Sequence, residues 1–207
     1  GAEGGGPVWR DLAGLWVSAG RSDIERRTAS GVPVEIQLDS LAAKLNGAVA
    51  RTSYSLLAQR SEKTFLGRGV SAERAPETGW DQSGPFDLAK LSSETLLGEG
   101  WGLDASVSLT SGVFRLEPRG RDAIVLGADG VWRGGFLSSI RQPSSEQAQL
   151  ETFGSLRTGA VIHSPRFGVQ WRHQQDSLHD FCGERATVTY APGAALPDLS
   201  LLWAEQS

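Results

Sequence analysis

Short strand-like segments follow one another between Ala105 and Leu137 too closely for helices to lie between them. Val107 and Leu109 alternate with polar residues, residues 113–116 form a second such segment, and glycine-containing turns separate it from the segments around it. Successive parallel strands would need crossover connections of about a dozen residues or more, usually with a helix. The chain is therefore expected to form an antiparallel all-β domain, either a sandwich or a barrel.

The same alternation predicts further strands along the chain. Residues 32–38 alternate apolar and polar side chains, and residues 14–18 read as a first strand. Asn46-Gly47 favours a type I′ hairpin turn, because both residues accept positive φ. This turn would join residues 41–45 to 48–57, although the alanines of the first segment also allow a helix. Later strands are expected at residues 123–126, 131–137, 161–162, 169–172 and 186–190.

Two segments are predicted to be helical. Residues 7–12 begin with a proline, which a first helical position tolerates, and residues 144–153 follow a capping serine with helix-favouring Glu, Gln, Ala and Leu. Residues 72–91 contain prolines and glycines without a sustained period, which predicts a long loop. The chain thus divides into a flexible N-terminus (1–6), one barrel domain (7–191) and an extended C-terminal tail (192–207).

Charge and hydropathy exclude several classes of partner. The 20 Lys and Arg residues are scattered singly among 24 Asp and Glu residues, so the chain has no basic stripe for nucleic acid. No run approaches the ~18–20 apolar residues of a membrane helix, so we expect a soluble protein without a transmembrane segment. The absence of methionine and the opening glycines fit either a removed leader or an artificial start.

Residues that could carry catalysis or bind a metal are sparse. Cys182 is the only cysteine, which excludes an intramolecular disulfide. A strand would place the nearby His179 and Asp180 on opposite faces, which argues against a nucleophilic site. The spacing of the three histidines fits no zinc motif, and the glycine pairs lack the spacing of a phosphate loop. We therefore predict no catalytic and no metal-binding residue.

The seven tryptophans are more informative, because such side chains either fill a core or line a pocket. Tryptophan rings stack on a flat conjugated ligand, and arginine pairs with its carboxylates. A ligand-binding barrel would therefore turn Trp132, Trp171 and Arg172 towards its cavity.

Two stretches resemble known proteins. G-L-W at residues 14–16 resembles the Gly-x-Trp opening of lipocalin-like barrels. S-P-R-F-G-V-Q-W-R at residues 164–172, followed by D-F-C-G-E-R at 180–185, is similar to the C-terminal part of the S-type phycobiliprotein chromophore lyases (the CpcS/CpeS family). The resemblance implies an antiparallel lipocalin-like barrel in which Trp16 closes one end and Glu184 takes a ligand-binding position. Gly168 and Gln170 stand where that family has arginines, which counts against lyase activity.

The resemblance also implies a plastid photosynthetic setting. We expect a non-catalytic barrel, soluble or peripheral to the thylakoid, that binds a tetrapyrrole or other apolar pigment such as bilin, chlorophyll or carotenoid. Equally, the barrel could serve as an accessory subunit of a photosystem or antenna assembly, with residues 72–91 and 192–207 contacting the partner proteins. The alternative is a chromophore lyase that attaches a bilin to a phycobiliprotein cysteine.

Overall fold

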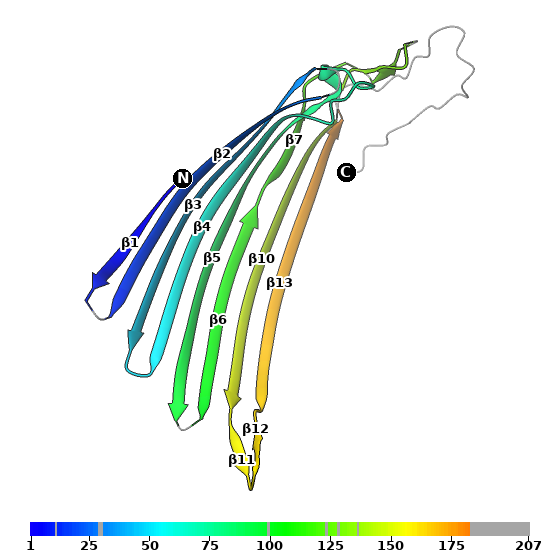
Figure 1. The fold of residues 1–207 in the computed structure, drawn as a ribbon. Coiled ribbons are helices and arrows are strands. Elements are labelled where there is room, and N and C mark those ends of the chain that lie inside the picture. The colour runs from blue at the N-terminus through cyan, green and yellow to red at the C-terminus, as the bar shows by residue number, and fades with distance from the viewer. Residues whose placement is uncertain are drawn as a thin grey trace.

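The computed structural model describes residues 1–182 without 11, 29, 30, 99, 123, 128 and 136. Long strands dominate it and lie side by side in one antiparallel sheet, in the order β1-β2-β3-β4-β5-β6-β10-β13 (Figure 1). Their bounds are β1 Ala2–Trp9, β2 Ala13–Arg27, β3 Pro33–Val49, β4 Thr52–Arg68, β5 Trp80–Gly98, β6 Trp101–Gly112, β10 Leu137–Gly154 and β13 Arg166–Cys182. The expectation of an antiparallel all-β chain is confirmed.

Shorter elements lie at the two ends of this sheet. At one end β7 (Phe114–Pro118) pairs with β5 and β10, and near it are the hairpin of β8 (Val125–Leu126) with β9 (Trp132–Arg133) and the 3₁₀ turn η1 (Pro76–Thr78). The hairpin of β11 (Leu156–Thr158) with β12 (Val161–His163) extends the opposite end (Figure 1).

The connections differ in length between the two ends. Residues 10–12, 50–51 and 99–100 join consecutive strands at one end, which we call the turn end (Figure 1). Residues 28–32, 69–79 and 113–136 make the connections at the other end, the loop end, and residues 155–165, which contain β11 and β12, make one longer connection at the turn end. Nearly every long strand thus pairs with its neighbour in sequence, and the sheet is an up-and-down meander.

The sheet does not close on itself within the described residues. β1 and β13 form its two edges, and no pairing between described residues joins them. Val34 and Val70 are the only buried hydrophobic side chains in the described part of the chain, and Thr78 and Gln82 are the buried polar ones. A closed lipocalin-like barrel would hold a continuous core inside the sheet. The described residues form the expected antiparallel strands, but they do not form the expected closed barrel.

Both predicted helices are strands. Residues 7–9 belong to β1, and residues 144–153 form most of the second half of β10. β10 pairs with β6 on one side and β13 on the other, so its backbone groups are bonded on both sides. Helix propensity separates ordinary residues by only ~0.7 kcal/mol each, and tertiary pairing overrides a preference of that size.

Three other expectations need correction. Asn46-Gly47 lies inside β3, and the hairpin turn falls at residues 50–51, where Ala50 takes φ 55°. Residues 41–45 are strand, as the expected hairpin required, whereas 80–91 of the predicted loop belong to β5. In each case the strand continues through polar or small residues because both neighbouring strands pair with it. Residues 2–6, expected to be flexible, begin β1, whereas 186–190 and 192–207 lie outside the described residues.

Candidate functional site

The two faces of the sheet differ sharply in chemistry. Successive residues of a strand point to opposite faces, and we call the face that carries Leu56 face A and the face that carries Leu57 face B. The registers of the seven paired strands from β2 to β13 then assign every residue to a face.

One row of residues on face A is apolar in all seven strands. Each member stands directly opposite the next across the sheet, in the order Leu15, Leu45, Leu56, Leu91, Val107, Ala148 and Trp171. Ala148 is half-buried, and the six larger side chains are open to the surroundings, from 39% exposed at Leu15 to 53% at Trp171. Leaving so many large apolar side chains in water would be unusual, because contiguous exposed patches of this kind mark interaction surfaces.

The apolar surface continues on both sides of that row. In β3 it runs from Leu41 through Ala43 and Leu45 to Val49, which spans about nine residues. A tilted strand needs roughly 9–11 residues to cross the hydrocarbon core of a bilayer. Tyr54 lies on face A nearer the turn end, in the position where membrane barrels carry interfacial aromatic residues.

The row directly behind the apolar one, on face B, is mostly polar. Its members are Trp16, Lys44, Leu57, Lys90, Ser108, Gln147 and Arg172. The next face B row towards the turn end contains only glycine and side chains with hydroxyl or amide groups: Gly14, Asn46, Ser55, Ser92, Ser106, Gln149 and Gln170. All members of this row except Gln170 border a hollow of about 860 Å³ near the turn end. Face B thus carries the hydrogen-bonding groups at the level where face A is apolar.

The apolar side changes from face A to face B towards the loop end. Ile24, Ile36 and Phe65 form a row on face B there, and Gln82 extends it. The few buried side chains belong to the same end, since Val34 lies near the start of β3 and Gln82 near the start of β5. A strand that keeps one apolar face would not show this change, so the strands pass through two different environments.

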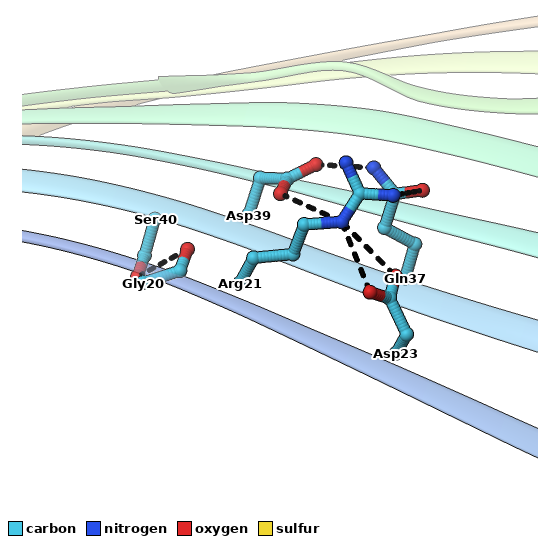
Figure 2. Close-up of polar contacts among 6 residues, drawn as sticks. All are labelled: Gly20, Arg21, Asp23, Gln37, Asp39 and Ser40. Carbon is cyan, nitrogen blue, oxygen red and sulfur yellow. Dashed lines mark hydrogen bonds and ion pairs between the residues drawn. The ribbon is translucent and has the colours of Figure 1, made fainter. Parts of the chain in front are cut away.

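A charged cluster on face A marks the point of that change (Figure 2). Arg21 Nε donates to both carboxylate oxygens of Asp23, at 3.2 and 3.0 Å, and Arg21 Nη2 donates to Gln37 Oε1 at 2.8 Å. Gln37 Nε2 in turn donates to Asp39, whose Oδ1 lies 4.0 Å from Arg21 Nε. Arg60 and Asp87 pair at 3.5 Å on the same face. About half or more of each of the Arg21, Asp23, Arg60 and Asp87 side chains is exposed, and ion pairs this exposed contribute little to stability.

Glycines allow aromatic rings to lie flat on the sheet near the turn end. A Cβ at Gly102 would lie 2.4 Å from the Phe153 ring, and one at Gly154 would lie 2.4 Å from Trp101. Arg166 stands over the Phe153 ring at 5.9 Å and pairs with Glu151 at 2.5 Å. Ring-over-glycine contacts of this kind hold the register of neighbouring strands.

The loop end contains a second set of ion pairs. Arg119 Nε donates to Asp81 Oδ1 at 2.7 Å, and Asp81 also accepts the backbone N–H of Gly67 at 3.0 Å. In the β8–β9 hairpin, Asp129 accepts hydrogen bonds from Arg133 at 3.0 Å and from the Val131 amide at 3.1 Å. The Arg133 bond, reinforced by the amide, holds the pKa of Asp129 well below its ordinary value.

The structure brings the predicted ligand-binding residues together only in part. Trp16 and Arg172 share a row on face B but lie six strand spacings apart, about 29 Å. Trp171 points to face A, where its ring stacks on His173 at 6.3 Å between centroids. Trp132 lies in β9, outside the large sheet, and Glu184 lies outside the described residues. Ligand binding by these five residues stays a prediction.

Other sequence expectations can be placed in the same way. β13 carries His179 on face A and Asp180 on face B, as strand alternation requires. Among the described residues, no group of three or more His, Cys, Asp or Glu side chains could hold a metal ion. None of the helices within the described chain has the length and apolar character to cross a membrane.

The apolar row and the polar row behind it were missed by sequence reasoning, although the sequence holds a signal for the apolar row. In β3 the apolar residues are even-numbered at Val34 and Ile36 but odd-numbered at Leu41 and Leu45. The switch from even to odd positions suggests that the strand is interrupted. In the structure the strand is continuous, and the switch marks the point where its apolar residues change from face B to face A.

Comparison with known proteins adds evidence on the fold. No protein-family model matches the sequence, and no curated protein matches it. Among solved structures, the chain is similar to the outer membrane transporter YddB from Escherichia coli, with a TM-score of 0.64 and 13% sequence identity. The match covers 85% of this chain and 25% of that chain, so this chain spans about a quarter of the transporter's length. At this identity the similarity concerns the fold alone.

Proposed function

We propose that these strands form part of the wall of a membrane-spanning β-barrel of the outer-membrane type. Face A would contact lipid along the apolar row, and face B would face an aqueous interior. The observation that carries the proposal is the apolar row itself, which crosses seven strands and has a polar row directly behind it. Membrane barrels alternate lipid-facing and lumen-facing residues in this manner.

Three further features support the same function. The apolar segment of β3 has about the length that a tilted strand needs to cross a bilayer. The ion pairs of Arg21 and Arg60 begin where the apolar surface ends, as expected for strands that emerge into water. Three of the four connections at the turn end are only two or three residues long, like the short turns of outer-membrane barrels, and the fourth, residues 155–165, contains the β11–β12 hairpin. YddB is described as a transporter, and we include transport of a solute in the proposal because the polar face B would line the path of the solute.

Cysteine accessibility tests the assignment of the two faces. The full chain would carry Leu56→Cys or Leu57→Cys, with Cys182 replaced by serine, and would be reconstituted into phosphatidylcholine vesicles. A water-soluble maleimide is expected to label the cysteine at 57 and to spare the one at 56, because adjacent residues point to opposite faces. In detergent-free denaturant both cysteines should react equally, which controls for intrinsic reactivity.

Quenching by brominated lipid gives an independent readout in a single-tryptophan chain. Trp171 lies in the apolar row and should be quenched, whereas Trp16 lies on face B and should not. Equal labelling of the cysteines at positions 56 and 57, together with an unquenched Trp171, would refute the proposal that face A contacts lipid.

The functions implied by the lyase resemblance stay predictions. They are pigment binding, accessory-subunit and lyase roles, and a plastid location. Visible absorbance of the purified chain, or quenching of its tryptophan fluorescence by added bilin, chlorophyll or carotenoid, would favour pigment binding. Association with a photosynthetic assembly would favour the accessory role.

A further inference from the structure

Three cations stand at the same depth in the sheet as the apolar row, but on the opposite face. Lys44, Lys90 and Arg172 belong to the face B row directly behind it and are exposed. Arg172 Nη2 donates to Gln147 at 3.3 Å, an uncharged partner. Among the described residues, no ion pair engages any of the three cations. Ionisable groups at mid-membrane depth are costly and mark solute or ion pathways.

Neighbouring carboxylates do not cancel these charges. Glu94 and Asp104 lie on the same face but four residues nearer the turn end, about 13 Å along the strands, and Glu3 of β1 lies on that face about 12 Å from Lys44. Both distances exceed the Debye length of roughly 8 Å at physiological ionic strength. On the other side, Asp176 is held by Arg141 at 2.8 Å, and Glu151 is held by Arg166. The row therefore keeps a net positive charge over seven strands.

We infer that the Lys44–Lys90–Arg172 row is an anion-attracting strip on the inner wall, selecting small anions and solutes that carry carboxylate or phosphate groups. This inference rests on the proposed function, because it needs face B to border water. Rings of Lys and Arg make the selective surfaces of anion pores. At about 7 Å in water, one such charge enriches a monovalent anion roughly two- to threefold, and adjacent strands add their contributions.

Leu57 is well placed to report on this strip. It stands directly between Lys44 and Lys90 in the row, on the intervening strand β4. A cysteine there can react with methanethiosulfonate reagents of opposite charge, one bearing a sulfonate and one bearing a trimethylammonium group. The ratio of the two rates measures the local potential, because both reagents attack the same thiol.

The experiment uses the full chain with Leu57→Cys and Cys182→Ser in phosphatidylcholine vesicles. The sulfonate reagent is expected to react preferentially, and adding Lys44→Gln with Lys90→Gln should lower the rate ratio about tenfold. Raising the salt concentration to about 1 M should remove most of the preference by screening. Lys63→Gln is the matched control, since Lys63 is a face B lysine of β4 six residues nearer the loop end, and it should leave the ratio unchanged.

An unchanged ratio in the double variant would overturn the strip, as would a cysteine at 57 that neither reagent reaches. Labelling of a cysteine at position 56 is measured in parallel. Equal labelling at positions 56 and 57 would refute the membrane-spanning wall. The ratio of the two reaction rates at position 57 would still test the strip by itself. Iodide quenching of Trp16, which stands opposite Lys44, provides a second measurement without the added cysteine. It should fall about twofold relative to acrylamide quenching when Lys44 becomes glutamine.

Discussion

Placing a charge in the apolar row should destabilise the membrane-inserted chain far more than placing it one residue away. Leu56 stands between Leu45 and Leu91, and no carboxylate is opposite it. Leu56→Arg would therefore put an unpaired guanidinium against lipid near the middle of the apolar surface. Arginine on the lipid face of a membrane barrel costs about 2–4 kcal/mol at the bilayer midplane, which is roughly a 30- to 700-fold change in the unfolding equilibrium.

Ser55→Arg is the matched control for this prediction. Ser55 precedes Leu56 at nearly the same depth, but it lies on face B between Asn46 and Ser92, which are polar. The arginine would stay in water there, so a change within about 0.5 kcal/mol is expected. Urea unfolding in vesicles, followed by tryptophan fluorescence, gives both free energies. Equal losses for the two variants, or a larger loss for Ser55→Arg, would refute the assignment of the faces.

Three further changes probe local geometry. Ala50→Gly should raise the free energy of unfolding by about 1 kcal/mol, because alanine is strained at φ 55°; a lower midpoint in urea would contradict this. Asp129 keeps its pKa below the ordinary value through Arg133, so its contribution is complete above pH ~4 and is lost only as pH falls through the depressed pKa. Hydrogen-exchange protection of that hairpin should be equal at pH 7 and 5, and Asp129→Asn should lower it at both. Gly102→Val should displace the ring above it and reduce stability, whereas Gly98→Val, with open space around its Cβ position, should cost less.

The positions of the strands could be predicted from the sequence more readily than their lengths. Residues 14–18 and 32–38 lie within β2 and β3 as expected, but β3 continues to Val49. Alternation of apolar and polar residues identifies a strand only while the apolar residues stay on one face. In β3 the apolar residues change from one face to the other near Asp39. Residues 144–153 read as a helix because their helix-favouring side chains conceal an alternation in which only Ala148 and Leu150 are clearly apolar on face A.

Much of the candidate site could not be predicted because it depends on register. Lys44, Lys90 and Arg172 are far apart in sequence, and only strand pairing places them in one row. The criterion of a long apolar run also applies to membrane helices alone, since a spanning strand needs apolar residues only at every second position. The tryptophans drew attention for their size, yet Trp16 and Trp171 point to opposite faces.

The meander also has a consequence for how the chain folds. Because neighbouring strands are mostly consecutive in sequence, hairpins such as β3–β4 can form first and the sheet can grow by adding one hairpin at a time. Each addition must choose its alignment, and an error of one residue would exchange Leu56 with Leu57 along the whole strand. Such an error would bring Lys63 and Gln59 to face A beside correctly aligned neighbours. The turn at residues 50–51 and the aromatic rings over Gly102 and Gly154 therefore fix the alignment of the strands while the sheet forms, in addition to stabilising the folded sheet.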